Sequence, residues 1–173
     1  MPILYSSGLS NLEISILESN YSISLPHDYK LFLTTYNGYR ISSPDYCDLP
    51  YDNVDDGFIT FDVLFGSKIL NEHFCLEHIN NEFLDEISHI NDTFLIGEDS
   101  GGNFYILITQ GERQGVYYWD RTGLHINDEK KGYTYQGINN YSSIYKTHNS
   151  FTDFFEEITL TIGDKEKILS LSL

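Results

Sequence analysis

Phe94-Leu-Ile-Gly-Glu-Asp-Ser-Gly-Gly-Asn-Phe-Tyr-Ile-Leu-Ile108 is the stretch that decides the fold of this chain. Its two ends, residues 94–96 and 104–108, consist of apolar residues that are mostly aromatic or β-branched, which predicts two strands buried on at least one face. Residues 99–103 between them are Asp, Ser, Gly, Gly and Asn, which accept turns and positive φ. The stretch therefore predicts a β-hairpin at the centre of a sheet.

The size and composition of the chain predict one globular domain over residues 1–173. Hydrophobic residues make up 40% of the sequence, including 14 Tyr and 11 Phe, which is enough to build a core without disulfides. Cys47 and Cys75 lack a CxxC spacing and suit a reduced intracellular protein. No basic segment followed by an apolar run begins the chain, and no run has transmembrane length. We expect a cytoplasmic protein with no membrane partner.

Two helices are expected in the first forty residues. The first spans residues 9–18, where Ser10 and Glu13 have the spacing of a capping box. The second spans residues 25–38, with Pro26 at its first position and Gly38 closing it.

The other segments complete an alternation of strands, helices and loops. Apolar, glycine-bounded runs predict strands, 3.6-residue periodicity predicts helices, and polar segments without periodicity predict loops. We expect strands at 115–120 and 144–146, and at 57–66 a strand or a strand followed by a short turn. We expect a helix at 69–90, with a possible break near Asn80 and Asn81, and a last helix at 150–158 that Ser150 caps. The segments 41–56 and 125–141 are expected to be loops.

The net charge of −16 limits the partners that the protein can bind. It disfavours nucleic acids and other phosphate-bearing partners. The imbalance is concentrated in residues 41–112, which contain 15 Asp and Glu and a single basic residue, Lys68. Two interpretations stay open: the acidity keeps the protein soluble, or it forms a surface that attracts a basic protein.

The expected loop 41–56 carries the densest group of carboxylates. It holds Asp45, Asp48, Asp52, Asp55 and Asp56 and no basic residue. A loop of this length suggests a role in binding. Calcium is an unsuitable ligand, because the DxDxDG spacing with a closing Glu is absent.

No catalytic, cofactor or metal site emerges from the motifs. Ser100 is followed by Gly, as is the nucleophile of trypsin-like proteases, but a turn also requires small residues at these positions. His73, Glu77 and His78 lie on one expected helix without the HExxH pattern of a zinc site. Residues 97–102 lack the Lys-Ser or Lys-Thr of a phosphate-binding loop. We expect neither an enzyme nor a cofactor.

Three separated patterns resemble the SUKH superfamily when taken in order. They are Leu25-Pro-x-Asp-Tyr-Lys-x-Phe-Leu followed by Tyr36-Asn-Gly38, then Phe94-Leu-Ile-Gly-x-Asp-x-Gly-Gly-Asn-Phe-Tyr105 with Gly115-Val-Tyr-Tyr-Trp119, and finally Ser150-Phe-x-x-Phe-Phe155. The motifs span roughly residues 9–158. The superfamily includes yeast regulators of cell-wall synthesis and many bacterial immunity proteins that neutralise toxins.

The resemblance implies a single α+β domain with a curved, mostly antiparallel sheet flanked by helices, and no enzymatic activity. It also implies a cognate toxin domain as the partner, with a basic nuclease as one suitable class, and leaves a regulatory scaffold as the alternative. An acidic inhibitor gains association rate against a basic toxin. The candidate partner-binding residues are then Asp45, Asp48, Asp52, Asp55, Asp56, Glu98 and Asp99.

Overall fold

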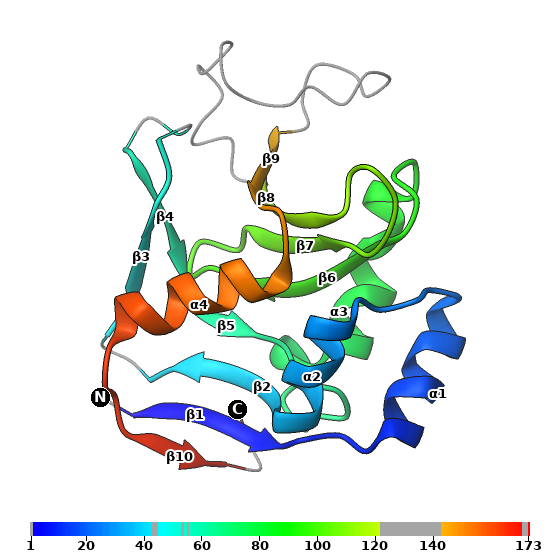
Figure 1. The fold of residues 1–173 in the computed structure, drawn as a ribbon, viewed down its shortest axis with the longest axis horizontal. Coiled ribbons are helices and arrows are strands. Elements are labelled where there is room, and N and C mark those ends of the chain that lie inside the picture. The colour runs from blue at the N-terminus through cyan, green and yellow to red at the C-terminus, as the bar shows by residue number, and fades with distance from the viewer. Residues whose placement is uncertain (1, 43–44, 53, 55, 122–142, 171–172) are drawn as a thin grey trace.

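The computed structural model describes residues 2–42, 45–52, 54, 56–121, 143–170 and 173. Eight strands form one twisted sheet in the order β10-β1-β2-β5-β6-β7-β8-β9 (Figure 1). All neighbouring strands are antiparallel except β1 and β10. Their bounds are β1 (Ile3–Ser7), β2 (Tyr36–Ile41), β5 (Val63–Leu64), β6 (Thr93–Glu98), β7 (Phe104–Ile108), β8 (Gly115–Asp120), β9 (Ser143–His148) and β10 (Lys167–Leu169).

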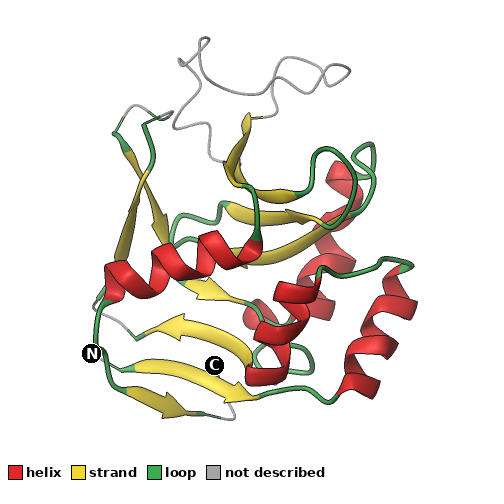
Figure 2. Ribbon diagram, viewed as in Figure 1, coloured by secondary structure: helices red, strands yellow, loops and turns green. Residues whose placement is uncertain are grey.

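Helices cover both faces of the sheet, as Figure 2 shows. One face carries α2 (His27–Thr35) and α4 (Phe151–Ile162), and α1 (Asn11–Tyr21) packs beside α2. The other face carries α3 (Leu76–Phe83), flanked by the 3₁₀ turns η1 (Glu72–Phe74) and η2 (Leu84–Ile87). The structure is therefore the expected α+β fold with a curved, mostly antiparallel sheet.

Aromatic residues on the two faces of β7 show how the layers pack. Successive side chains of a strand point to opposite faces. Accordingly, Tyr105 contacts Phe154 of α4 with ring centroids 4.9 Å apart, while Phe104 contacts Phe83 of α3 at 5.2 Å. Tyr105, Phe104 and Phe154 are all at most 2% exposed. Trp119, which is 8% exposed, also lies in the core.

The central hairpin is confirmed as strands β6 and β7. Other strands flank it on both sides in the sheet. Gly97 is required where β6 passes β5, because a Cβ there would lie 2.4 Å from the carbonyl oxygen of Val63. A β-bulge between Leu95 and Gly97 shifts the register of the hairpin.

The caps of two helices are also confirmed. Ser10 and Glu13 form the predicted capping box at the start of α1. Ser150 accepts a hydrogen bond from the backbone N–H of Asp153 at the start of α4.

The end of the second helix differs from the sequence prediction. The helix stops at Thr35 and β2 begins at the next residue, so that Gly38 lies inside β2 rather than at a helix end. Gly38 has φ +89° and its backbone lies close to Gly66, and a Cβ there would be 3.2 Å from the Gly66 nitrogen. The glycine thus permits a close backbone approach. Pro26 precedes the helix as its N-cap instead of occupying the first helical position.

The expected long helix at 69–90 is wrong in extent, because only residues 76–83 form an α-helix and 3₁₀ turns precede and follow it. Asn80 lies inside this helix and is 2% exposed. Its amide donates to the carbonyl of Leu95 and accepts the Leu95 N–H, both at 2.9 Å. Since β5 is only two residues long, the Asn80 side chain supplies the hydrogen bonds of a missing strand beside β6.

Two further segments differ from the sequence predictions, and two more complete the comparison. The run 57–66 is divided between β4 (Phe58–Phe61) and β5, which belong to two different sheets. The expected loop 41–56 contains β3 (Cys47–Pro50). The short edge strand expected at 144–146 is confirmed as β9, whereas the loop expected at 125–141 lies outside the described residues.

Candidate protein-interaction surface

The strands β3 and β4 form a separate hairpin, called the arm below, that stands beside the main sheet (Figures 1 and 2). Its register pairs Cys47 with Phe61 and Leu49 with Ile59, and all four side chains are at most 3% exposed. This face of the arm packs toward α4, where Phe61 meets the ring of Phe154. The alternating residues of the arm are left on its other face.

Hydrogen bonds from three elements hold the arm in place. The Tyr51 hydroxyl at its tip donates to the carbonyl of Lys146 in β9 at 2.9 Å. The Tyr105 hydroxyl of β7 donates to the carbonyl of Thr60 at 2.5 Å. Thr60 in turn donates to the carboxylate of Asp99 at 3.4 Å. These bonds fix the arm relative to the main sheet, so its outer face is preorganised for binding.

Four of the five predicted loop aspartates lie on the arm or at its base, and the fifth, Asp55, lies outside the described residues. Asp45, Asp52 and Asp56 are exposed and Asp48 is half-buried. Residues 45–61 include no Lys or Arg, so the negative charge of this surface is not offset from within the arm.

Two exposed aromatic side chains accompany these carboxylates. Tyr46 is 75% exposed at the base of the arm, and Phe58 is 41% exposed on β4. Aromatic residues are enriched at protein interfaces and dominate their binding energy. The sequence predicts only carboxylates as partner-binding residues. Tyr46 could have been recognised from the sequence by its place between Asp45 and Asp48, but its exposure could not.

Asp99 serves the central hairpin. It is 5% exposed, and its carboxylate accepts hydrogen bonds from the backbone N–H groups of Gly101 and Asn103, from the Asn103 amide and from the Tyr118 hydroxyl, at 2.7–2.9 Å. The carboxylate is therefore directed into the turn rather than toward solvent.

Glu98 is half-buried beside a second carboxylate. Burial, and then the charges of Asp62 and Asp99, raise the pKa of Glu98 to about 7. Burial also raises the pKa of Asp62. The positive charge of Arg40 lowers that pKa by a smaller amount, and its Nε lies 3.6 Å from the Asp62 carboxylate. Of the two hairpin candidates, Glu98 is the one that retains contact with solvent.

The alternative sites considered from the sequence have local structural roles. Ser100 is an exposed turn residue. Glu77 accepts hydrogen bonds from the Ser67 hydroxyl, the Lys68 backbone N–H and the Cys75 thiol. Within the described part of the chain, no group of three or more His, Cys, Asp or Glu side chains is placed to hold a metal ion.

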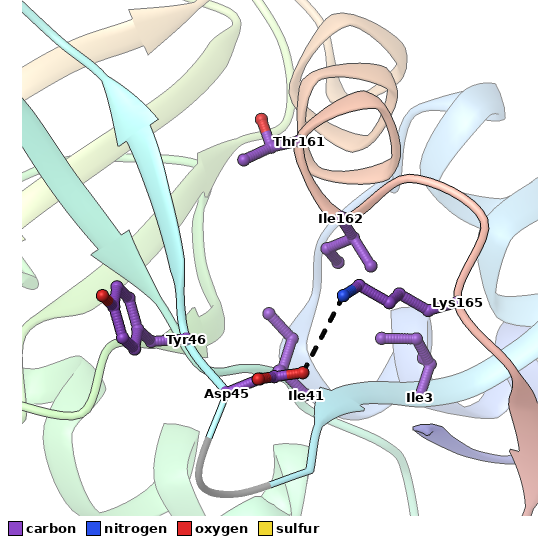
Figure 3. A pocket seen from close by; sticks show the side chains of 7 residues that line it. All are labelled: Ile3, Ile41, Asp45, Tyr46, Thr161, Ile162 and Lys165. Atoms are coloured by element: carbon purple, nitrogen blue, oxygen red, sulfur yellow. Dashed lines mark ion pairs between the residues drawn. The ribbon is translucent and has the colours of Figure 1, made fainter. Parts of the chain in front are cut away.

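A pocket of about 340 Å³ opens at the base of the arm (Figure 3). It lies where β1, β2, the start of the arm and the end of α4 meet. Its lining consists of Ile3, Ile41, Asp45, Tyr46, Thr161, Ile162 and Lys165. No sequence pattern predicts this pocket, because its residues come from distant parts of the chain.

Comparison with protein families matches residues 8–157 to the model of the SMI1 / KNR4 family (SUKH-1). The chain belongs to this family. The matched range includes the arm, the central hairpin and most of α4, whereas β1 and β10 lie outside it. A search of curated proteins found no match.

Membership in SUKH-1 confirms the resemblance inferred from the three sequence patterns. It supports a function as an immunity protein or as a regulator of the cell-wall type, and it suggests a toxin as the kind of partner. Among the described residues, no helix is both long and apolar enough to cross a membrane.

Proposed function

We propose that this SUKH-1 protein is an immunity protein that binds a cognate toxin domain and neutralises it without catalysis. The observation that carries the proposal is the arm, a rigid hairpin that combines Asp45, Asp48, Asp52 and Asp56 with the exposed rings of Tyr46 and Phe58. Such a surface offers a partner both apolar anchors and charge complementarity.

The charge of the molecule favours a basic partner. The net charge of −16 repels nucleic acids, and a carboxylate-rich surface resembles the phosphates that a nuclease binds. A basic nuclease domain would therefore associate rapidly with the arm, and the arm would obstruct its substrate-binding surface. Electrostatic steering of this kind raises association rates most at low ionic strength.

Co-expression tests the proposal directly. The toxic domain encoded beside this protein is expressed with and without it in a susceptible bacterial host. We expect the protein to restore growth and to form a complex that survives size-exclusion chromatography. Failure to rescue growth together with failure to form a complex would refute the proposal for that pair.

The role of the acidic arm is tested by neutralising its charge. Changing the five aspartates at 45, 48, 52, 55 and 56 to Asn should slow association about tenfold or more at low salt and flatten its salt dependence. The matched control neutralises five carboxylates that lie outside the arm, namely Glu72, Glu82, Asp85, Asp92 and Glu112. Equal effects of the two sets on stopped-flow association rates would place the interface elsewhere.

The same family supports a second candidate, a regulatory scaffold that binds an endogenous protein through the arm. The two candidates differ in the gene neighbourhood that they predict. An adjacent coding sequence for a secreted toxic domain favours the immunity protein, whereas its absence and a stable complex with a host protein favour the scaffold.

A further inference from the structure

The pocket at the base of the arm has an apolar floor and a polar rim. Ile3, Ile41 and Ile162 are 1%, 3% and 9% exposed and form the floor. Asp45 and Tyr46 stand on the side of the arm, and Lys165 stands on the opposite side, after the end of α4 (Figure 3). A pocket of this size and lining can hold a side chain that has an aliphatic stem and a charged end.

Lys165 already places a cation in this pocket. Its side chain extends toward the arm, and its Nζ lies 3.9 Å from the carboxylate of Asp45 (Figure 3). This distance is long for an ion pair. The two side chains are 41% and 40% exposed, so solvent screens their attraction. A cation from a partner can displace it at little cost.

We propose that this pocket receives an arginine side chain of the basic partner, which replaces Lys165 on Asp45. The aliphatic stem of the arginine packs on the isoleucine floor, and its guanidinium binds the carboxylate of Asp45. This inference names the anchor for the proposed function and rests on it.

The chemistry of the rim favours arginine over lysine. A guanidinium can bind a carboxylate with two parallel hydrogen bonds and can stack on an aromatic face, whereas an ammonium is a compact point charge. The ring of Tyr46 points away from Lys165 and from the Asp45 carboxylate (Figure 3), so the preference for arginine rests on the paired hydrogen bonds to Asp45. The planar cation therefore outcompetes the tethered ammonium of Lys165.

A small probe tests the pocket without the toxin. ¹⁵N-labelled protein is titrated with Nα-acetyl-L-arginine methylamide, and with the citrulline analogue, which has the same shape without the charge. We expect saturable shifts of the backbone amides of Ile41, Asp45, Tyr46 and Lys165, with the citrulline analogue binding about tenfold more weakly. Asp45→Asn should abolish the preference for arginine, whereas Asp52→Asn, on the arm but outside the pocket lining, should preserve it.

The variant Lys165→Met tests whether Lys165 competes with arginine for Asp45. Removing the competing cation while keeping the length of the side chain should strengthen arginine binding about two- to fivefold. Unchanged or weaker binding in Lys165→Met, equal binding of arginine and citrulline, or shifts confined to other parts of the molecule would overturn the proposal. If the arginine probe does not bind, the proposal that the acidic arm binds a toxin is unaffected. If co-expression does not restore growth, binding of the arginine probe still supports the arginine site.

Discussion

Replacing Asp99 with Ala should destabilise the protein more than the replacement of any of the exposed aspartates of the arm. The Asp99 carboxylate organises the turn of the central hairpin and also bonds to its neighbours. Two backbone N–H groups and the Asn103 amide bond to it within the turn, the Tyr118 hydroxyl reaches it from β8, and Thr60 reaches it from the arm. Burial, and then the charge of Asp99, raise the pKa of Tyr118 well above its usual range, so its hydroxyl stays protonated and donates.

The magnitude follows from the donors left without a partner. Hydrogen bonds to a charged group each contribute about 1.5–3 kcal/mol, but bonds within one network do not add. Asn103 and Tyr118 are 1% and 2% exposed, so water cannot easily replace the lost acceptor. We expect Asp99→Ala to reduce the free energy of unfolding by about 3–5 kcal/mol, out of the 5–15 kcal/mol typical of a domain.

The measurement is equilibrium unfolding in urea, followed by the fluorescence of the single tryptophan, Trp119, and by circular dichroism. Tyr118→Phe removes one donor and should reduce the free energy of unfolding by about 1–2 kcal/mol. In the double variant the losses should fall short of their sum, because the two side chains interact directly. A loss below about 1 kcal/mol for Asp99→Ala would refute the view that this carboxylate organises the hairpin.

Three further variants test other parts of the structure. The raised pKa of Glu98 means that the folded state holds its proton to higher pH than the unfolded state, so this group lowers the free energy of unfolding as pH rises from about 4.5 to about 7. Glu98→Gln should therefore stabilise the protein by about 1 kcal/mol at pH 8, after allowance for solvent screening, and not at pH 4, as urea midpoints across pH would show; a pH-independent difference would contradict this. Asn80→Ala leaves the backbone groups of Leu95 without their side-chain partner and should cost about 2–4 kcal/mol in urea unfolding, with exposed Asn91→Ala as the control. Ser10→Ala removes the capping box of α1 and should cost about 1 kcal/mol in thermal or urea unfolding, and no loss would show that water caps the helix equally well.

The elements predicted correctly from the sequence are those that local chemistry determines. Ser10 with Glu13, and Ser150 before Phe151, mark the starts of helices through side-chain bonds to nearby N–H groups. The Asp-Ser-Gly-Gly-Asn turn likewise bonds within itself, so the hairpin was recognisable from its own residues.

The elements that were missed depend on distant partners. Strand β1 pairs with β2 and β10, and Gly38 faces Gly66, so neither the edge of the sheet nor the role of this glycine is encoded locally. The candidate site follows the same division. Its carboxylates were visible as a cluster in the sequence, whereas the inward use of Asp99 and the approach of Lys165 to Asp45 require the folded chain.

The alternation of side chains along the arm makes it an exchangeable module. Cys47, Leu49, Ile59 and Phe61 attach it to the core, while the outward positions of Tyr46, Asp48, Pro50 and Phe58 take little part in that packing. Selection can therefore diversify the outward positions, and a library can randomise them, with little loss of folding stability. Related proteins with the same fold can in this way bind different partners, and each specificity is determined by a few residues of a single hairpin.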